Sequence, residues 1–197
     1  MARRFLFVLG SSRRGGNTEL LARRAAEQLP GDVEQRWIHL AEHPLPDFED
    51  RRHADGVSDG DGPLPEHENI TLLRDAALAA TDLVIASPLY WYSVSAQTKR
   101  YLDHWAAWLR IPGVDFRATM AGRTLWGVTA LATEAEVAEP LIGTLNNTAA
   151  YMGMRFGGVL LGIGDKPGEV LSDTDALARA KTFFAGEAPL ARFPGRD

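Results

Sequence analysis

Two short loops, each entered from a run of apolar residues, constrain this chain more than any other feature of its sequence. The first reads Gly-Ser-Ser-Arg-Arg-Gly-Gly-Asn-Thr at 10–18 and follows the apolar run 5–9; the second reads Ser-Pro-Leu-Tyr-Trp-Tyr-Ser at 87–93 and follows the run 83–86. Short continuous apolar runs are typical of strands buried on both faces, as in a parallel sheet. In such sheets, ligands bind beyond the carboxyl ends of the strands, where the winding direction reverses. The two loops are therefore predicted to share one crevice.

The rest of the chain continues an alternation of strands and helices. Apolar runs of strand length and apolar residues at helical spacing follow one another, with breaks at Pro30-Gly31 and Pro112-Gly113. The predicted strands are 5–9, 33–40, 83–87, 124–131 and 156–161. The first predicted helix runs from the caps Asn17 and Thr18 to 29, and the others cover 70–80, 95–109, 137–152 and 174–184. Right-handed crossovers between parallel strands place helices on both faces of the sheet. We therefore expect a single doubly wound α/β domain over residues 1–197.

Residues 41–69 interrupt this alternation. They are rich in Pro, Gly, Asp, Glu and His and contain too few apolar residues to form a layer of their own. A long irregular segment in a compact domain is either a functional lid or a flexible surface loop, and the sequence favours neither. His43, His53 and His67 fall here, but their wide spacing lacks the short repeat of a preformed metal site, so no metal is expected.

The composition limits the chemistry. The chain has no cysteine, which excludes disulfides, iron–sulfur clusters, cysteine-bound zinc and thiol nucleophiles. Any redox chemistry must therefore be carried by a bound cofactor. The net charge of -5 offers no basic surface for nucleic acid, and no apolar stretch is long enough to cross a bilayer. Because a secretory signal is also lacking, we expect a cytoplasmic protein.

The first loop has the character of a phosphate cradle. Its glycines allow tight turning, and the following helix presents free N–H groups with a partial positive charge. Possible side-chain donors are Ser11, Ser12, Asn17 and Thr18, with Arg13 and Arg14 as possible charge-assisted contacts. The alternative is an ordinary capped turn between a strand and a helix. A nucleotide triphosphatase P-loop is not supported, because Gly16 stands where its lysine must be, and the Gly-x-Gly-x-x-Gly pattern of a dinucleotide site is absent.

The second loop is aromatic and conformationally restricted. Pro88, Tyr90, Trp91 and Tyr92 could form a wall for a flat heterocycle, with backbone N–H groups near its polar edge. The alternative is that the aromatic side chains pack on a neighbouring helix or on another subunit. Their place at a predicted switch point favours a ligand or an interface over the core.

Together the two motifs resemble those of the NAD(P)H-dependent FMN reductase and quinone reductase family of flavodoxin-like proteins. The resemblance rests on 10–18 and on Ser-Pro-Leu-Tyr-Trp-Tyr-Ser-Val-Ser-Ala-Gln-Thr-Lys-Arg-Tyr-Leu-Asp at 87–103, and the order of elements agrees over most of the chain. It implies a five-stranded sheet in the order 2-1-3-4-5 and a bound FMN. The residues that it implies are Ser11, Ser12, Arg13, Gly16, Asn17 and Thr18 for the phosphate, Pro88, Leu89, Tyr90, Trp91, Tyr92 and Ser93 for the ring, and Ala130 and Thr133 after the fourth strand.

The chain departs from the family in two places. Many members carry glycine where this chain has Tyr92, and many have glycines in the loop after the fourth strand, where this chain reads Ala-Leu-Ala-Thr-Glu at 130–134. Lys99 and Asp103, four residues apart, are interpreted as a structural ion pair. The family also implies a homodimer, for which Trp105 and Trp108 are candidate anchors, with burial in the core as their alternative.

The resemblance implies an NAD(P)H oxidoreductase in which the flavin performs the chemistry and the protein supplies position and access. We hypothesise a ping-pong cycle, in which a nicotinamide delivers hydride, leaves, and is replaced by a flat acceptor such as a quinone. One alternative is an electron-transfer flavodoxin, although Arg13 and Arg14 do not suit a uniformly acidic docking face. Another is a regulatory or binding module without turnover, which the departures at Tyr92 and 130–134 motivate.

Overall fold

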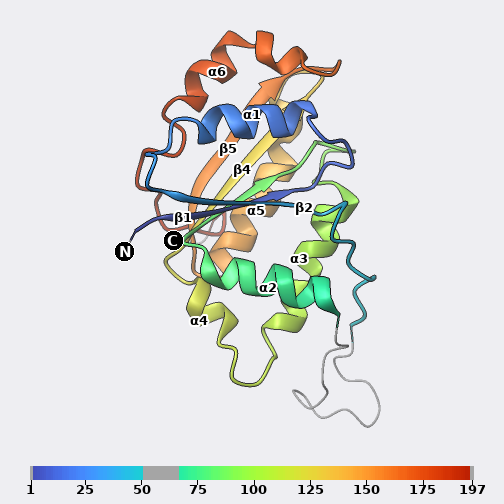
Figure 1. Ribbon diagram of the computed structural model, residues 1–197, viewed down its shortest axis with the longest axis vertical. Helices are drawn as coiled ribbons and strands as arrows, with labels where there is room; N and C mark the ends of the chain where they lie inside the picture. Colours follow the sequence, from blue (N-terminus) through green and yellow to red (C-terminus); the bar gives the residue numbers. More distant parts are fainter. Residues whose placement is uncertain (1, 51–66, 196–197) are drawn as a thin grey trace.

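The structure is a computed structural model that describes residues 2–50 and 67–195 (Figure 1). Within these residues, one sheet of parallel strands runs in the order β2-β1-β3-β4-β5. The strands are β1 (Arg4–Leu9), β2 (Glu34–His39), β3 (Asp82–Ala86), β4 (Thr124–Leu131) and β5 (Arg155–Ile163). The predicted doubly wound, flavodoxin-like sheet is therefore confirmed, including its strand order.

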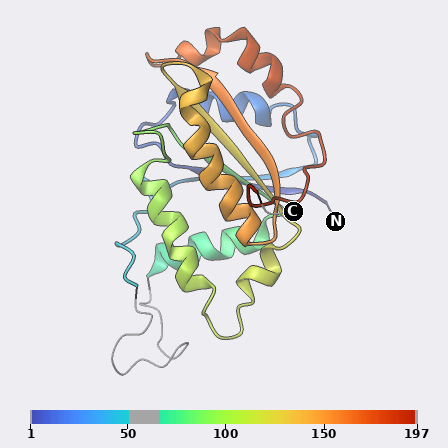
Figure 2. The same ribbon diagram turned by 180° about the vertical axis from the view of Figure 1, so that it is seen from behind.

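Helices cover both faces of the sheet (Figures 1 and 2). One face is covered by α1 (Asn17–Ala26) and α6 (Thr174–Ala180), and the other by α2 (Glu68–Ala79), α3 (Ala96–Trp108), α4 (Phe116–Met120) and α5 (Glu139–Tyr151). Two 3-10 turns, η1 (Ala135–Ala138) and η2 (Glu169–Ser172), precede α5 and α6. Side chains of β1 alternate between the two cores, so that Leu6 and Val8 pack on one face while Phe5 and Phe7 pack on the other. This two-sided burial explains why the strand is continuously apolar.

Several boundaries differ from the predicted ones. The first helix ends at Ala26 rather than 29 and the last at Ala180 rather than 184. The N-cap of α1 is Gly16, so the expectation that Asn17 and Thr18 cap this helix was wrong; both side chains bind elsewhere, as described below. The five-residue helix α4 was not predicted, because it is too short to show helical periodicity.

Trp105 and Trp108 lie in the core and not on a surface. Together with Tyr101 and Phe116 they form a cluster of edge-to-face rings whose centroids lie 5.3–5.9 Å apart. Burial strongly raises the pKa of the Tyr101 hydroxyl despite its contact with Trp105, so this phenol stays neutral. The proposed role of the two tryptophans as dimer anchors was therefore wrong, and their alternative as core residues is confirmed.

The described start of the 41–69 excursion packs against the domain. Leu45 is buried in the core, Nδ2 of Asn69 donates to the Pro44 carbonyl at 2.9 Å, and Nε2 of His104 lies 3.0 Å from the Pro46 carbonyl oxygen. Residues 40–48 are thus held between α2 and α3, which does not fit a loose surface loop. Residues 51–66, including His53, lie outside the described part of the chain. None of the helices in the described part is long and apolar enough to span a membrane.

Candidate functional site

The two loops leave neighbouring central strands and are linked through residues beside them. The phosphate loop (10–18) leaves β1 and the ring loop (87–93) leaves β3, and these strands pair directly. The Gly10 N–H donates to the Ala86 carbonyl at 2.8 Å, which extends the pairing of the strands by one residue. The Ser95 hydroxyl, at the start of α3, donates to the Gly10 carbonyl at 2.6 Å. The structure therefore brings the two predicted site segments together at the carboxyl edge of the sheet.

The N-terminus of α1 leaves backbone N–H groups unpaired in the described part of the chain. Its N-cap is Gly16, which has no side chain to accept from the first turn. Within the described residues, the backbone N–H groups of Asn17 and Thr18 have no acceptor, and the first helical bond is that from Leu20 N–H to the Gly16 carbonyl at 2.9 Å. Unpaired N–H groups at the positive end of a helix favour an anion such as a phosphate.

The Asn17 side chain has a different use from the predicted one. Its Nδ2 donates to the carbonyls of Gly164 and Lys166, both at 2.9 Å, and its Oδ1 accepts from the Gly168 N–H at 2.8 Å. Both amide hydrogens are consumed, so the expectation of a side-chain donor was wrong for Asn17, and only its backbone N–H remains for a phosphate. These bonds hold the 164–168 turn against the start of α1. Sequence reasoning missed this turn because its partner lies almost 150 residues away.

The other predicted phosphate residues differ in their surroundings. The Ser11 oxygen accepts from the Arg13 N–H at 3.1 Å, and buried Thr18 accepts from the Ala130 N–H at 3.3 Å, which ties the end of β4 to α1. Ser12 and Arg13 are exposed. Arg14 pairs with Glu42 at 2.5 Å, whereas Arg13 has no acidic partner among the described residues. Arg13 is therefore the better placed of the two arginines to meet an anion.

The buried side chain of Glu19 supports the phosphate loop by a hydrogen bond to its backbone. Its buried carboxylate accepts from the Gly15 N–H at 2.8 Å and from Arg23 Nε and Nη2 at 2.9 and 2.7 Å. Burial would raise the pKa of Glu19, but the Gly15 N–H, the Arg23 guanidinium and nearby His39 outweigh it, and the pKa lies below its usual value. Gly15 has a φ of +62°, a conformation that glycine adopts without strain.

The ring loop ends in a tight turn with an unusual sequence. Tyr90 and Ser93 exchange backbone hydrogen bonds of 3.0 and 3.1 Å, and the central residues Trp91 and Tyr92 have φ values of +48° and +64°. Positive φ at both central residues is typical of a type I′ turn, which normally takes Asn-Gly. Their side chains are 93% and 57% exposed, and that of Tyr90 is 55% exposed. Strained residues that present aromatic rings to solvent are typical of a binding site.

The remaining ring residues lie beside this turn or beyond β4. Pro88, Leu89 and Ser93 are partly buried, and Leu89 packs on the core. Ala130 is buried at the end of β4 and contacts the phosphate loop through Thr18. Thr133 is exposed in the next loop, and no hydrogen bond within 2–50 and 67–195 ties it to either predicted site segment. Ala130 is thus linked to the phosphate loop by a hydrogen bond, whereas Thr133 only lies at the same edge of the sheet.

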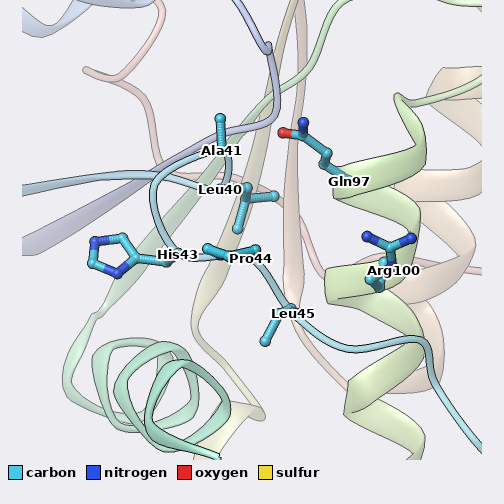
Figure 3. Close-up of a pocket in the computed structure, with 7 residues that line it drawn as sticks. All are labelled: Leu40, Ala41, His43, Pro44, Leu45, Gln97 and Arg100. Atoms are coloured by element: carbon cyan, nitrogen blue, oxygen red, sulfur yellow. The ribbon is translucent and has the colours of Figure 1, made fainter.

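A cavity of about 120 Å³ lies between the segment after β2 and α3 (Figure 3). Its lining residues are Leu40, Ala41, His43, Pro44, Leu45, Gln97 and Arg100. The Gln97 amide points toward Leu40 and Ala41, and its Oε1 is buried without a hydrogen-bond partner among the described residues. Arg100 pairs with Asp47 at 2.7 Å. No local sequence pattern indicates this cavity, because its two sides are far apart along the chain.

Comparison with known proteins decides the family. Residues 3–163 match the family described as NADPH-dependent FMN reductase. The chain belongs to this family. It is also 32% identical over 175 residues to YwqN of Bacillus subtilis strain 168, whose provisional name is NAD(P)H-dependent FMN-containing oxidoreductase; the match covers 88% of this chain and 92% of YwqN. The expected dependence on FMN and NAD(P)H is therefore confirmed at the level of the family.

Solved structures agree with the fold. The Trp repressor binding protein from Bacillus subtilis is 25% identical, with a TM-score of 0.70 over 91% of this chain and 97% of that one. The NAD(P)H:quinone oxidoreductase from Methanothermobacter marburgensis has the same TM-score over 96% of this chain and all of that one, at 14% identity. At such low identity the second likeness shows the fold alone.

The residues on this edge fit FMN. The cofactor has a phosphate at one end and a flat ring at the other. The site offers an uncapped helix N-terminus after β1 and a turn of exposed aromatic residues after the neighbouring strand β3. The free N–H groups suit the phosphate and the aromatic faces suit the ring.

Proposed function

We propose that this member of the family is an NAD(P)H oxidoreductase that holds FMN at the carboxyl edge of its sheet and passes two electrons to a flat acceptor such as a quinone in a ping-pong cycle. The observation that carries this proposal is the link between the two loops: the Ser95 hydroxyl donates to the Gly10 carbonyl of the phosphate loop, and the Ser95 N–H donates to the Ser87 oxygen of the ring loop. In the described structure, unpaired N–H groups at the start of α1 and three exposed aromatic side chains on the loop after the neighbouring strand together favour a ligand over a purely structural turn.

The phosphate loop binds the phosphate through backbone and side-chain groups. The proposed contacts are the N–H groups of Gly16, Asn17 and Thr18, the hydroxyls of Ser11, Ser12 and Thr18, and the Arg13 guanidinium. Because the dipole of α1 and Arg13 both favour negative charge, this loop supplies most of the electrostatic part of the binding.

The ring loop orients the cofactor. Pro88 to Ser93 would form one wall of the ring site, and Ala130 and Thr133 would meet the pyrimidine end of the ring. When bound, FMN supplies the chemistry by accepting hydride from a nicotinamide and returning two electrons to the acceptor. The side chains of this chain therefore position the reactants and control access, and none needs to act as a nucleophile. The wide exposure of Trp91 leaves space for two flat reactants to use the site in turn.

The acceptor class and the assembly belong to the same proposal. Solved structures of similar fold include a quinone oxidoreductase, which supports a flat quinone as the acceptor. We also propose a cytoplasmic homodimer. Since Trp105 and Trp108 are core residues, the exposed aromatic turn replaces them as the candidate contact. Size-exclusion chromatography with light scattering tests the dimer, and a monomer at micromolar concentration would contradict it.

The decisive experiment is anaerobic reduction. The purified protein is reconstituted with FMN, freed of excess cofactor, and mixed with NADH or NADPH. We expect flavin absorption that is lost on addition of the nicotinamide and returns with a quinone. A protein that binds no FMN would contradict the proposal, and bound FMN that neither nicotinamide reduces would leave an electron carrier in its place.

A matched pair of arginines tests the phosphate assignment. Replacing Arg13, which has no acidic partner in the described structure, by Ala should weaken FMN binding about tenfold, because a charge-assisted contact is lost. Arg14→Ala, which removes a side chain already paired with Glu42, should change it less than about threefold. The measurement is titration of FMN fluorescence, and equal effects of the two substitutions would contradict the assignment.

A further inference from the structure

Three buried hydroxyl groups join the two loops of the site. Ser87 is the first residue of the ring loop and follows β3 directly. Ser95 is the N-cap of α3, and Thr98 lies in the first turn of that helix. All three are almost inaccessible to solvent. Buried hydroxyl groups must find hydrogen-bond partners, so their bonds fix the geometry around them.

Ser95 uses each of its polar groups for a different neighbour. Its backbone N–H donates to the Ser87 oxygen at 2.8 Å, and its own oxygen accepts from the Thr98 N–H at 3.2 Å. That second bond is the usual cap of a helix. A cap needs only the acceptor oxygen, yet the Ser95 hydroxyl hydrogen is directed to the Gly10 carbonyl at 2.6 Å, across to the phosphate loop.

Gly10 is pressed directly against the start of α3. Its N–H is held by the Ala86 carbonyl and its carbonyl by Ser95, and a Cβ at this position would lie only 1.8 Å from the Thr98 hydroxyl oxygen. No side chain separates the two loops here. The phosphate loop and the start of α3 therefore lie within one hydrogen bond of each other.

We propose that Ser95 is a positioning residue that holds the phosphate loop and the ring loop in register, so that one ligand engages both at once. This inference rests on the proposed function. A two-ended ligand gains affinity when its second contact is made within the same complex, and that gain is lost when the two subsites no longer match the ligand. Ser95 acts through Gly10 and not by touching the cofactor.

Riboflavin provides the test, because it is FMN without the phosphate. The dissociation constants of both flavins are measured by fluorescence titration, and their ratio reports how much the phosphate adds. In Ser95→Ala, FMN binding should weaken about tenfold while riboflavin binding changes less than about threefold, so the preference for FMN falls. A merely structural role would lower the melting temperature without changing this ratio.

Three further variants separate positioning from capping. Ser95→Gly keeps a favoured N-cap residue but has no hydroxyl, so it should lose the preference for FMN as Ser95→Ala does, and it carries the test if the alanine variant does not fold. Ser95→Thr restores a hydroxyl and should restore the preference. Thr98→Val removes the neighbouring hydroxyl but leaves the bond from Ser95 to Gly10, and should keep the preference.

The outcomes are distinct. A wild-type protein that binds neither flavin overturns the proposed function, and this inference falls with it. A wild-type protein that prefers FMN, together with Ser95 variants that keep the same preference, overturns this inference alone and leaves Ser95 as a helix cap. Loss of the preference in Ser95→Ala and Ser95→Gly, with its return in Ser95→Thr, supports it.

Discussion

The two loops at the carboxyl edge of the sheet both contain residues with positive φ, but they use different residue types there. Each needs residues with positive φ, and the phosphate loop places this conformation on Gly15 whereas the ring loop places it on Trp91 and Tyr92. A phosphate is recognised by backbone N–H groups, so side chains can be omitted there. A flat ring is recognised by the faces of side chains, so glycine cannot be used at every position. If the ring loop binds a flavin as we propose, backbone strain is tolerated where the side chain itself is needed for binding.

Gly10, where the two loops touch, should be the most sensitive position. In Gly10→Ala the new methyl group would lie 1.8 Å from the oxygen of the buried Thr98 hydroxyl, so β1 or α3 would have to shift. We expect a loss of about 3 kcal/mol in the free energy of unfolding, measured in urea. Gly31→Ala is the matched control, because a Cβ there meets no atom within 4 Å, and it should change stability by less than about 0.5 kcal/mol.

A second substitution sharpens this test. Adding Thr98→Ala to Gly10→Ala removes the oxygen that the methyl group meets, and should recover part of the lost stability. If the double variant is no more stable than the sum of the single ones predicts, the contact between Gly10 and Thr98 does not set the spacing of the loops.

Glu19 should matter next, because it holds only the phosphate loop. In Glu19→Gln the charge that accepts from Gly15 and from Arg23 is lost inside a buried site. Hydrogen bonds to a charged group contribute more than neutral ones, so we expect a loss of about 2 kcal/mol in the free energy of unfolding at pH 7. The measurement is again urea unfolding, and a change below about 0.5 kcal/mol would show that the carboxylate is not part of the support of the loop.

The same substitution predicts a pH dependence. The folded-state pKa of Glu19 is lowered from the usual 4.5, so its contribution to stability is fully present above pH 4.5 and is lost as the pH falls through the folded value. The difference in stability between the wild type and Glu19→Gln should therefore shrink as the pH falls below 4.5. A difference that stays constant down to acidic pH would contradict this origin.

The fold was predictable from the sequence where burial repeats along the chain. Strand β4 was predicted with the bounds that the structure shows, because its run is mostly apolar and of strand length. Helix ends were less predictable because capping depends on where side chains find partners. Asn17 has the chemistry of a cap and of a phosphate donor, yet the turn at 164–168 takes its side chain. Contacts between distant segments leave no local pattern in the sequence.

The candidate site was likewise predictable only where its signals are local in the sequence. The motifs marked both loops, because the residue types that suit phosphate and aromatic ligands are local in sequence. The type I′ turn at Trp91 and Tyr92 contradicts the local preference for Asn-Gly, and its conformation could not be predicted from those residues. The burial of Trp105 and Trp108 depends equally on distant partners such as Phe116.

The ring loop offers the third test. Tyr92→Gly and Tyr92→Ala both remove the ring, but only glycine relieves the positive φ. We expect the glycine variant to be about 1 kcal/mol more stable than the alanine variant in thermal or urea unfolding, while both weaken flavin binding. Equal stability of the two variants would show that this turn stores no backbone strain, and the contrast with Gly15 would then disappear.

The smallest effect is expected at the helix that follows the ring loop. Helices α1 and α3 each carry an ion pair four residues apart, Glu19 with Arg23 and Lys99 with Asp103, at 2.7 and 2.6 Å. The carboxylate side chain is 7% exposed in the first pair and 37% in the second. Because water screens an exposed pair, Lys99→Ala should lower the free energy of unfolding by no more than about 0.5 kcal/mol, and moderate salt should reduce even that. A loss near that of Glu19→Gln would mean that Lys99 supports the ring loop as firmly as Glu19 supports the phosphate loop. The support of the ring loop would then come from α3 as a whole and not only from the buried bonds of Ser95.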